Sequence, residues 1–417
     1  MTEFKTISEV FFENPTKDKI FLYLEDETYT YQQITELCFD FIYCVLEKKL
    51  LKKDFYIFSS SPKVIIVSYL ALNYLNKDVN IVSENVKEFL FSETGISKDN
   101  AVLIQSEEDF NNCVCIKHSD TLSLTNYLSS IKNRNSSIVQ YTSGTSGKPS
   151  KIVRTKESCF VEAMDLVTVW KYDEQSRIAC FTPFSYSFAF GNVVMAAIIS
   201  CSSIISCKKF DIKQVLPMLE KNCATHFVTV ISIIKLLLLQ QSKEKLNFLK
   251  YIICSGSKLN KKDEKKFYDK FKIHISEQYG MTETGALFYS YVSGDYFESA
   301  LPSVDYRINN DILFVKRRFS GLGEINTKDF VSLNRKNQIK ILGRSDSVLK
   351  LDDKRYSVEY ISSLFENKDY LTIAKKLLSC RKIILYSNEN NEENIKNIVS
   401  KLKAMESSIK VKIIKVK

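Results

Sequence analysis

One short segment of the chain, Ile138–Ser150 (IVQYTSGTSGKPS), contains the residue types best suited to holding phosphate. An apolar start is followed by seven residues that we assign to a phosphate-binding loop: Thr142, Ser143, Gly144, Thr145, Ser146, Gly147 and Lys148. Exposed N–H groups, hydroxyls and one ammonium group in such a loop can bind phosphate oxygens. A Walker P-loop is excluded because the two glycines stand too close together, and Pro149 prevents a helix from starting at once.

Two further segments with glycines follow or end apolar, strand-like runs. One is Ser255-Gly256-Ser257 after the run Tyr251–Cys254, and the other is Glu277–Gly285 (EQYGMTETG). The chain has only 11 glycines, under half of the roughly 7% that is typical. A glycine at such a position therefore indicates a positive φ or a close backbone approach to a ligand. Glu283 offers the hard carboxylate oxygen that Mg²⁺ takes together with phosphates.

The phosphate-binding segment resembles that of the adenylate-forming superfamily. This superfamily includes acyl- and aryl-CoA synthetases, luciferases and peptide-synthetase adenylation domains. The sequence YTSGTSGKPSKIV is very close to the family pattern YTSGTTGKPKGV, and the resemblance extends from about residue 20 to 415. It implies that Lys148 is catalytic and that the other loop residues bind the nucleotide phosphates.

The resemblance also assigns roles to the second and third segments. Thr282 would contact phosphate during catalysis, and Glu283 would bind the catalytic Mg²⁺. Tyr279 would lie against the adenine ring. Four residues of these segments are thereby expected in the nucleotide site: Ser255, Gly256, Tyr279 and Gly280.

The segment Gly343–Lys350 (GRSDSVLK) is similar to the family's G-R-x-D-x-x-I-K motif. By this resemblance, Arg344 would bind ribose and phosphate, Asp346 would lie at a hinge between two domains, and Lys350 is a candidate catalytic residue.

A third motif, Thr327-Lys328-Asp329, occupies the place of the family's T-G-D. Its carboxylate, Asp329, would accept hydrogen bonds from both ribose hydroxyls. Lys328 replaces the glycine of the family pattern, which is a departure at this site.

The segment Pro183–Gly191 (PFSYSFAFG) resembles the family's wall of the acid pocket, with Tyr186 where acyl- and aryl-CoA synthetases often have histidine. We assign Tyr186 and Phe190 to the substrate pocket, since an aromatic wall suits a mostly apolar acid. The alternative that the phenylalanines are plain core residues has equal weight. Peptide-synthetase domains keep an aspartate in this region, and residues 178–207 contain none, so an amino-acid substrate is not expected.

A second departure concerns the family's C-terminal P-x-x-x-x-G-K segment, whose lysine reaches the reacting carboxylate and the α-phosphate. No glycine follows Gly343, and Ile409–Val416 resembles the stretch before that segment, so we expect this lysine to be absent. Loss of one charge-stabilising donor typically costs about 3–4 kcal/mol of barrier. Adenylation could then be slow, use a preformed adenylate or depend on a partner chain. The alternative is an adenylation-fold protein with weak or no activity.

Strand-like runs alternate with amphipathic helical segments: Phe55–Phe58 and Val64–Leu75, Ile178–Thr182 and Val193–Ile199, His226–Val230 and Ser232–Gln240, Tyr251–Cys254 and Lys261–Phe271. The alternation predicts an α/β fold with parallel or mixed sheets flanked by helices. We expect a large N-terminal core domain over residues 1–343 and, after a hinge, a short α+β C-terminal domain over residues 344–417. The latter would contain Lys382–Tyr386, Glu392–Met405 and Lys410–Val416.

Composition limits the class of protein. With 45% hydrophobic and 26% charged residues, disorder over most of the chain is excluded. Residues 178–207 lack charge, but Pro183 and Gly191 interrupt them, so we predict a core strand and buried helix instead of a membrane span. The 11 cysteines form no CxxC pair, which favours reduced, mostly buried thiols over a zinc site. The start MTEFKTISEV has no signal segment, so we expect a cytoplasmic location.

The formal net charge of +10 could attract nucleotides, an acidic carrier protein or nucleic acid. A solvated lysine-rich surface explains it more simply. A nucleic-acid partner is not expected, because aromatic RNA-binding clusters and a recognition-helix motif are missing from the sequence.

Together, these patterns predict an ATP-dependent acid ligase that needs ATP and Mg²⁺. A fatty, aryl or other small carboxylic acid would be activated as acyl-AMP and transferred to the thiol of CoA or to the phosphopantetheine of an acyl carrier protein. The alternative is the nucleotide-binding protein of the same fold with weak or no activity.

Overall fold

The computed structural model describes residues 6–93, 96, 101–111, 136–142, 149–241, 246–256, 261–344, 348–351, 354–357, 370–371, 382–387, 400 and 410–415. Contacts divide the chain into two compact units. Unit 1 comprises Met1–Asp305 and Arg317–Gly323, and unit 2 comprises Tyr306–Lys316 and Glu324–Lys417. This division separates the chain earlier than the expected boundary after Gly343, because strands that precede Gly343 pair with one another in unit 2. The domain boundary and hinge at Gly343 stay a prediction.

Unit 1 contains a nine-stranded sheet in the order β14-β13-β12-β11-β10-β8-β9-β1-β2. Its strands are β1 (Ile20–Leu24), β2 (Glu27–Thr30), β8 (Arg177–Cys180), β9 (Ser203–Ser206), β10 (His226–Val230), β11 (Tyr251–Ser255), β12 (Ile275–Met281), β13 (Gly285–Ser290) and β14 (Ser299–Ala300). The strands from β12 to β1 are parallel, and β13, β14 and β2 add antiparallel edges. The carboxyl ends of the parallel strands therefore lie at one edge of the sheet.

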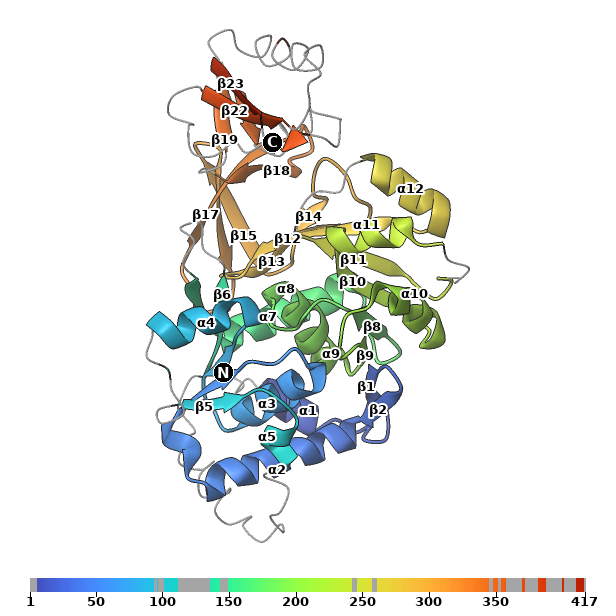
Figure 1. Ribbon diagram of the computed structural model, residues 1–417, viewed down its shortest axis with the longest axis vertical. Coiled ribbons are helices and arrows are strands. Elements are labelled where there is room, and N and C mark those ends of the chain that lie inside the picture. The colour runs from blue at the N-terminus through green and yellow to red at the C-terminus, as the bar shows by residue number, and fades with distance from the viewer. Residues whose placement is uncertain are drawn as a thin grey trace. The chain divides into compact units, whose positions relative to one another are not determined.

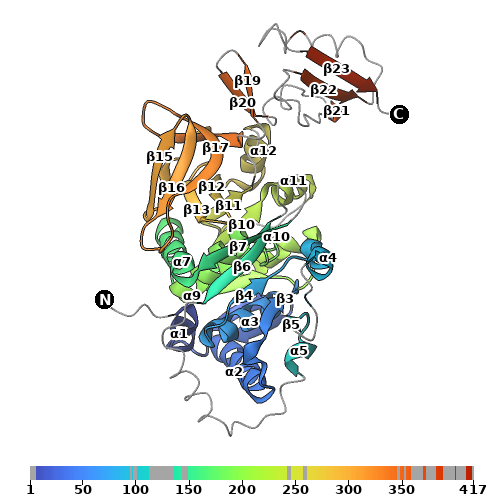
Figure 2. The ribbon, with the colours of Figure 1, turned by 90° about the vertical axis from the view of Figure 1, so that its left-hand side faces the viewer.

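A second sheet of unit 1 has five strands in the order β5-β3-β4-β6-β7. They are β3 (Asp54–Ile57), β4 (Val79–Ile81), β5 (Ala101–Ile104), β6 (Ser137–Thr142) and β7 (Ser150–Thr155). The first four are parallel, whereas β6 and β7 form an antiparallel pair beside β4 (Figure 2).

Helices pack on both sheets of unit 1. The α-helices are α1 (Ile7–Phe12), α2 (Tyr31–Glu47), α3 (Pro62–Tyr74), α4 (Glu84–Glu93), α5 (Glu108–Asn111), α7 (Lys156–Trp170), α8 (Ser187–Ala189), α9 (Ala196–Ser200), α10 (Ile212–Lys221), α11 (Ile231–Leu239) and α12 (Lys261–Phe271), with a 3₁₀ turn η1 (Leu50–Lys52) and a π-helix η2 (Phe190–Met195). Helices α10, α11 and α12 lie beside the nine-stranded sheet (Figure 1). Their apolar side chains share one core with strands β8 to β12.

The sequence explains where the best-defined helices begin. Thr30 caps α2 in a capping box with Gln33, and the Thr155 hydroxyl accepts the N–H of Ser158 at the start of α7. Helix α3 is apolar on every side and is buried on every side up to Asn73, as expected for a helix with no polar face.

Most of the strands of unit 2 belong to small sheets. The largest has the order β15 (Val304–Asn309), β16 (Ile312–Arg317), β17 (Ile325–Leu333) and β18 (Ile339–Arg344), and its last three strands pair antiparallel. The others are β19 (Val348–Leu351) with β20 (Lys354–Ser357), and β21 (Tyr370–Leu371) with β22 (Lys382–Ser387) and β23 (Lys410–Lys415).

The predicted α/β class is confirmed. Helix α12 has the predicted bounds, and β10 followed by α11 reproduces the predicted strand and helix within one residue. The uncharged stretch 178–207 forms β8, short helices and β9. Among the described residues, no helix is both long and apolar enough to cross a membrane. The predicted helix Glu392–Met405 lies, apart from Ser400, outside the described residues.

Cysteines in the described part of the chain are mostly free thiols, and five of the seven free ones are buried, as the sequence predicts. Cys44 departs from that prediction, because its sulfur is in a disulfide.

Candidate active site

Three predicted segments lie at the carboxyl edge of the nine-stranded sheet (Figure 1). Pro183–Gly191 follows β8, Gly256 follows β11, and Thr282 follows β12, and these strands are parallel members of the run β12-β11-β10-β8. This edge is where open α/β sheets bind ligands. The topology thus gathers residues that are up to 100 positions apart in the sequence at one edge of the sheet.

The turn between β12 and β13, residues 281–285, is called here the Thr282 loop. It is closed by a hydrogen bond of 3.2 Å from the Thr284 N–H to the Met281 carbonyl. Just before it, Gly280 lies opposite Ala286 at a register shift, and a Cβ on Gly280 would lie 2.5 Å from the Gly285 carbonyl oxygen. The backbone of residues 285 and 286 therefore lies too close to Gly280 for any residue with a side chain at this position.

The wall segment and the Thr282 loop contact each other through two hydroxyls. The Ser187 hydroxyl donates to the Thr282 hydroxyl over 3.2 Å. On the other side of the same segment, the Gln140 side-chain amide on β6 donates to the Ser185 carbonyl over 3.2 Å. The segment Pro183–Gly191 thereby joins the stem of the phosphate-binding segment to the Thr282 loop.

The phosphate-binding loop itself is described only at its two ends. Thr142 and Ser150 are paired at the open end of β6 and β7, and Thr142 is half-buried. The loop residues Ser143, Gly144, Thr145, Ser146, Gly147 and Lys148 lie outside the described residues. Their assignment to phosphate binding and catalysis stays a prediction.

The residues predicted to surround adenine differ in their exposure. The Tyr279 ring is half-buried, with its centroid 6.2 Å from that of Phe288 and 6.0 Å from that of Phe297. Gly256 is exposed at φ +105°, and open space lies where its Cβ would be. An exposed backbone in a conformation that favours glycine is what a ligand-contacting turn needs.

The two predicted pocket residues behave differently. Tyr186 is 47% exposed, whereas Phe190 is 3% exposed and packs edge-on against Tyr69 at a centroid distance of 4.9 Å. Phe190 begins the π-helix η2; single turns of this kind are frequent at functional sites. The burial of Phe190 agrees with the core interpretation, and its assignment to the substrate pocket stays a prediction.

In unit 2, the structure brings together the two residues predicted to bind ribose. Asp329 on β17 and Arg344 on β18 are direct cross-strand partners, so their Cβ atoms are expected about 5 Å apart. Asp329 is buried, and its N–H donates to the Thr327 hydroxyl over 3.1 Å. Lys350 lies on β19, and its side chain is outside the described part.

A group that the sequence reasoning missed lies beneath the Thr282 loop. It consists of four buried charged residues, called here the buried charge cluster: Arg154, Glu162, Asp165 and Arg317. Arg154 pairs with Glu162 over 2.7 Å, and Arg317 pairs with Asp165 over 2.5 Å. The spacing of Glu162 and Asp165, three residues apart in the otherwise apolar part of α7, was the available signal.

Burial also changes the ionisation of this cluster. It raises the pKa of Asp165, an effect opposed by hydrogen bonds from Ser303 and by the nearby Arg317. Burial lowers the pKa of Arg317, against the attraction of Glu162 and Asp165. A buried charge without a partner would destabilise the fold, so each of the four charged side chains needs its oppositely charged neighbour.

The metal role of Glu283 stays a prediction. The carboxylate lies at the tip of the Thr282 loop and is half-buried. No group of three metal-ligating side chains occurs among the residues whose positions are described. One carboxylate is what Mg²⁺ usually takes from a protein when phosphates supply other ligands.

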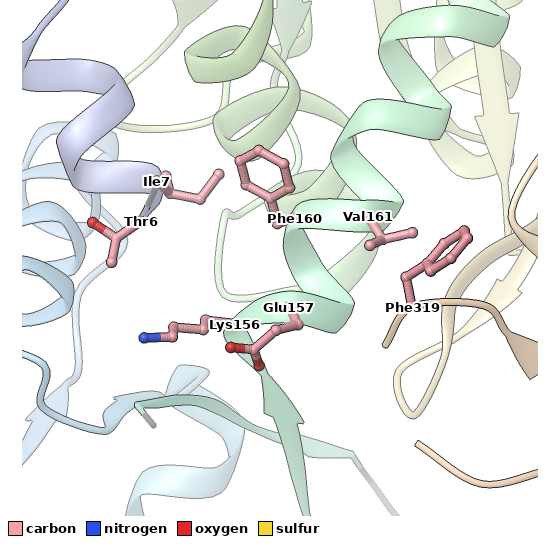
Figure 3. Close-up of a pocket in the computed structure, with 7 residues that line it drawn as sticks. All are labelled: Thr6, Ile7, Lys156, Glu157, Phe160, Val161 and Phe319. Carbon is pink, nitrogen blue, oxygen red and sulfur yellow. The ribbon is translucent and has the colours of Figure 1, made fainter. Parts of the chain in front are cut away.

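A small pocket lies elsewhere in unit 1, at the start of α7 (Figure 3). Its volume of about 20 Å³ is enough for little more than a water molecule. Its lining shares no residue with the predicted site: Thr6, Ile7, Lys156, Glu157, Phe160, Val161 and Phe319. It is therefore not the acid pocket.

Comparison with known families matches residues 54–315 to the family described as AMP-binding enzyme. The match spans well over half of the chain, so the chain belongs to the AMP-binding enzyme family. The resemblance stated from the sequence motifs is thereby confirmed.

Individual relatives are distant. Probable CoA ligase CCL5 of Humulus lupulus is 23% identical over 160 residues, which cover 37% of this chain and 29% of that protein. The chain thus matches less than a third of that relative's length.

Solved structures share the fold over nearly the whole chain. O-succinylbenzoate Coenzyme A Synthetase (MenE) from Bacillus subtilis, in complex with ATP and magnesium ion, has a TM-score of 0.76 at 15% identity, covering 98% of this chain and 95% of that chain. ATP-bound MatB from Rhodopseudomonas palustris has a TM-score of 0.75 at 14% identity, covering 98% and 94%. Likeness at this level of identity shows the fold alone.

Proposed function

We propose that the chain is an AMP-forming acid–thiol ligase. The observation that carries the proposal is the meeting of two predicted segments at one sheet edge: Ser187 of the acid-pocket wall bonds Thr282 of the nucleotide loop. An enzyme that joins a carboxylate to a nucleotide needs its acid and its phosphate groups side by side. Membership of the AMP-binding enzyme family supports the same activity.

The reaction would have two steps. In the first, a carboxylate oxygen of the acid attacks the α-phosphorus of ATP, the bond to the β-phosphate breaks, and pyrophosphate leaves. In the second, a thiol sulfur attacks the carbonyl carbon of the acyl-AMP, the thiol proton is lost, and AMP leaves. Alignment and electrostatic stabilisation of the phosphoryl charge supply most of the catalysis.

Residues of this chain would divide these tasks. Thr282 and the loop residue Lys148 would contact phosphate, and Glu283 would hold Mg²⁺, which when bound would neutralise phosphate charge. Asp329 and Arg344, which face each other on β17 and β18, would bind the ribose.

The residues of the wall segment indicate which class of carboxylic acid the site would bind. Tyr186 offers an exposed aromatic ring, and no aspartate occurs between residues 178 and 207 to pair with an amino group. A fatty, aryl or other small non-amino acid is therefore the proposed substrate. The name of the Humulus relative favours CoA as acceptor, with the phosphopantetheine of a carrier protein as the other candidate.

The test is ATP–pyrophosphate exchange with a panel of fatty, aryl and short hydroxy acids. At least one acid should support exchange, and Glu283→Ala and Lys148→Ala should each lower its rate tenfold or more, by loss of charge stabilisation. Glu88→Ala and Lys209→Ala remove exposed charges elsewhere in unit 1 and serve as matched controls.

Two outcomes separate the alternatives. Binding of MgATP without exchange for any acid would favour the nucleotide-binding protein of the same fold. Absence of both exchange and MgATP binding would contradict the proposed site altogether.

A further inference from the structure

The buried charge cluster contacts the Thr282 loop through backbone groups. Glu162 Oε1 accepts the N–H of Ala286 over 2.7 Å. Arg317 donates to the Thr284 carbonyl over 3.4 Å and, through its second terminal nitrogen, to the Ala286 carbonyl. One carboxylate and one guanidinium thus hold the peptide groups on both sides of Gly285.

Glu162 also contacts the wall of the predicted acid pocket. A Cβ on Gly191 would lie 3.1 Å from Glu162 Oε1, and a Cβ on Gly285 would lie 2.2 Å from its carboxyl carbon. The carboxylate therefore lies against both the wall segment and the Thr282 loop. Gly285 leaves no room for a side chain, whereas a Cβ at Gly191 would require the carboxylate to shift by a few tenths of an ångström.

The remaining members fix this carboxylate and guanidinium in place. Arg154 holds Glu162 and also donates to the Ser158 hydroxyl over 3.3 Å. Asp165 accepts from the N–H of Ser303 and from Arg317, which in turn donates to the Ser303 hydroxyl over 2.7 Å. Each of the four charges thus has an oppositely charged partner and at least one added hydrogen bond.

Stability alone does not explain such a cluster. Replacing a buried ion pair by apolar residues of similar volume is often neutral or stabilising. A buried carboxylate and guanidinium that form hydrogen bonds with a loop backbone, however, hold that loop in one conformation. Pre-organised loops bind ligands more tightly because less conformational entropy is lost on binding.

We propose that Glu162 and Arg317 are positioning residues that hold the Thr282 loop against the wall segment in the geometry that binds MgATP. The proposal rests on the proposed function, since it assumes that this loop binds the nucleotide. Both side chains are buried and reach the loop through its backbone at residues 284–286, so each would act on Thr282 and Glu283 indirectly.

A charge-balanced variant tests this proposal. Arg154→Met/Glu162→Met removes both charges of one pair with little change in volume, and it removes the acceptor for the Ala286 N–H. We expect the melting temperature to change by a few degrees at most and the Kd for MgATP, measured by calorimetry, to rise at least tenfold. Arg154→Met/Glu162→Gln restores an oxygen acceptor and should recover most of that affinity.

Two further variants test whether a loss of MgATP affinity comes from the loop contacts or from removal of any ion pair of unit 1. Arg317→Lys keeps a cation for Asp165 but cannot reach both carbonyls, so it should fold and bind MgATP several-fold more weakly. Lys63→Met/Glu107→Met removes another ion pair of unit 1, with nitrogen and oxygen 2.5 Å apart, and should bind MgATP as wild type does.

The outcomes are distinct. If both Arg154→Met/Glu162→Met and Arg317→Lys bind MgATP as tightly as wild type, the positioning role is wrong and the proposed function stands. If the glutamine variant fails to recover affinity lost in the methionine variant, the role of the Ala286 hydrogen bond is wrong. Wild-type protein that binds no MgATP would overturn the proposed function itself.

Discussion

Two positions, one in each unit, adopt the same left-handed backbone under opposite constraints. Gly285 in the Thr282 loop of unit 1 has φ +72°, and Lys328, inside β17 of unit 2 where the register with β16 shifts, has φ +61°. At Gly285, the Glu162 carboxylate lies where a Cβ would go, whereas Lys328 is exposed to solvent. A positive φ alone costs a side chain about 1–2 kcal/mol. What makes glycine indispensable is the buried group next to the backbone.

This comparison also explains the departure at Lys328. The family pattern has glycine there, but the conformation survives with lysine because the Lys328 N–H donates to the Asn326 side chain over 2.8 Å. Asp329 keeps its hydrogen bond to Thr327. The substitution therefore gives no structural reason to reject Asp329 as a ribose ligand.

The largest effect should come from Gly285→Ala. The new Cβ would displace Glu162 from its bonds to Arg154 and Ala286, which leaves a buried charge unpaired and costs about 3–5 kcal/mol. The positive φ adds about 1 kcal/mol. Urea unfolding should show a loss of at least about 4 kcal/mol, or failure to fold.

Lys328→Ala is the matched variant and should change stability by no more than about 0.5 kcal/mol. If Gly285→Ala costs less than about 1 kcal/mol, the carboxylate is free to move and the contrast between Gly285 and Lys328 disappears.

Unit 1 should lose stability in acid because it contains the buried imidazole of His226. His226 is fully buried on β10, and its ring nitrogens bond the Thr225 hydroxyl and the Trp170 carbonyl over 2.8 and 2.9 Å. Burial lowers the pKa of His226 from 6.5 to about 4. The unfolded chain takes up the proton below pH 6.5 and the folded chain does not, so stability is lost as the pH falls toward 4.

The loss should reach about 3 kcal/mol at pH 4. Trp170 is the single tryptophan and reports on unit 1, so urea unfolding followed by its fluorescence at pH 7 and pH 4 measures the effect. His226→Gln should flatten the dependence, and His274→Gln, which removes an exposed imidazole, is the control. A wild-type slope no steeper than that of His226→Gln would contradict the assignment.

Much of the fold followed from local sequence patterns. The run His226–Val230 and the helix Lys261–Phe271 were predictable because their apolar spacing and flanking residues agree with their final environment. The convergence of Gly256, Thr282 and the wall segment becomes clear only from the observed strand order, in which parallel strands place their carboxyl ends together.

The buried charge cluster could not be predicted in the same way. Glu162 and Asp165 are acidic residues on a helix, and such residues usually face water. Their partners Arg154 and Arg317 are 163 positions apart in the sequence, and only the folded chain brings both beside α7. The π-helix η2 was missed for a similar reason, because its pattern does not differ from that of an ordinary buried helix.

The smallest effect should come from Lys328→Gly. Glycine removes the left-handed strain of about 1–2 kcal/mol but adds unfolded-state entropy worth about 0.5–1 kcal/mol, so a net gain of up to about 1.5 kcal/mol is expected. Hydrogen exchange of the β17 and β18 amides should slow by up to about tenfold. Lys336→Gly makes the same chemical change at a lysine without positive φ and should speed exchange instead. Equal responses of the two variants would mean that the backbone at Lys328 carries no strain, and the contrast with Gly285 would then rest on the Glu162 carboxylate alone.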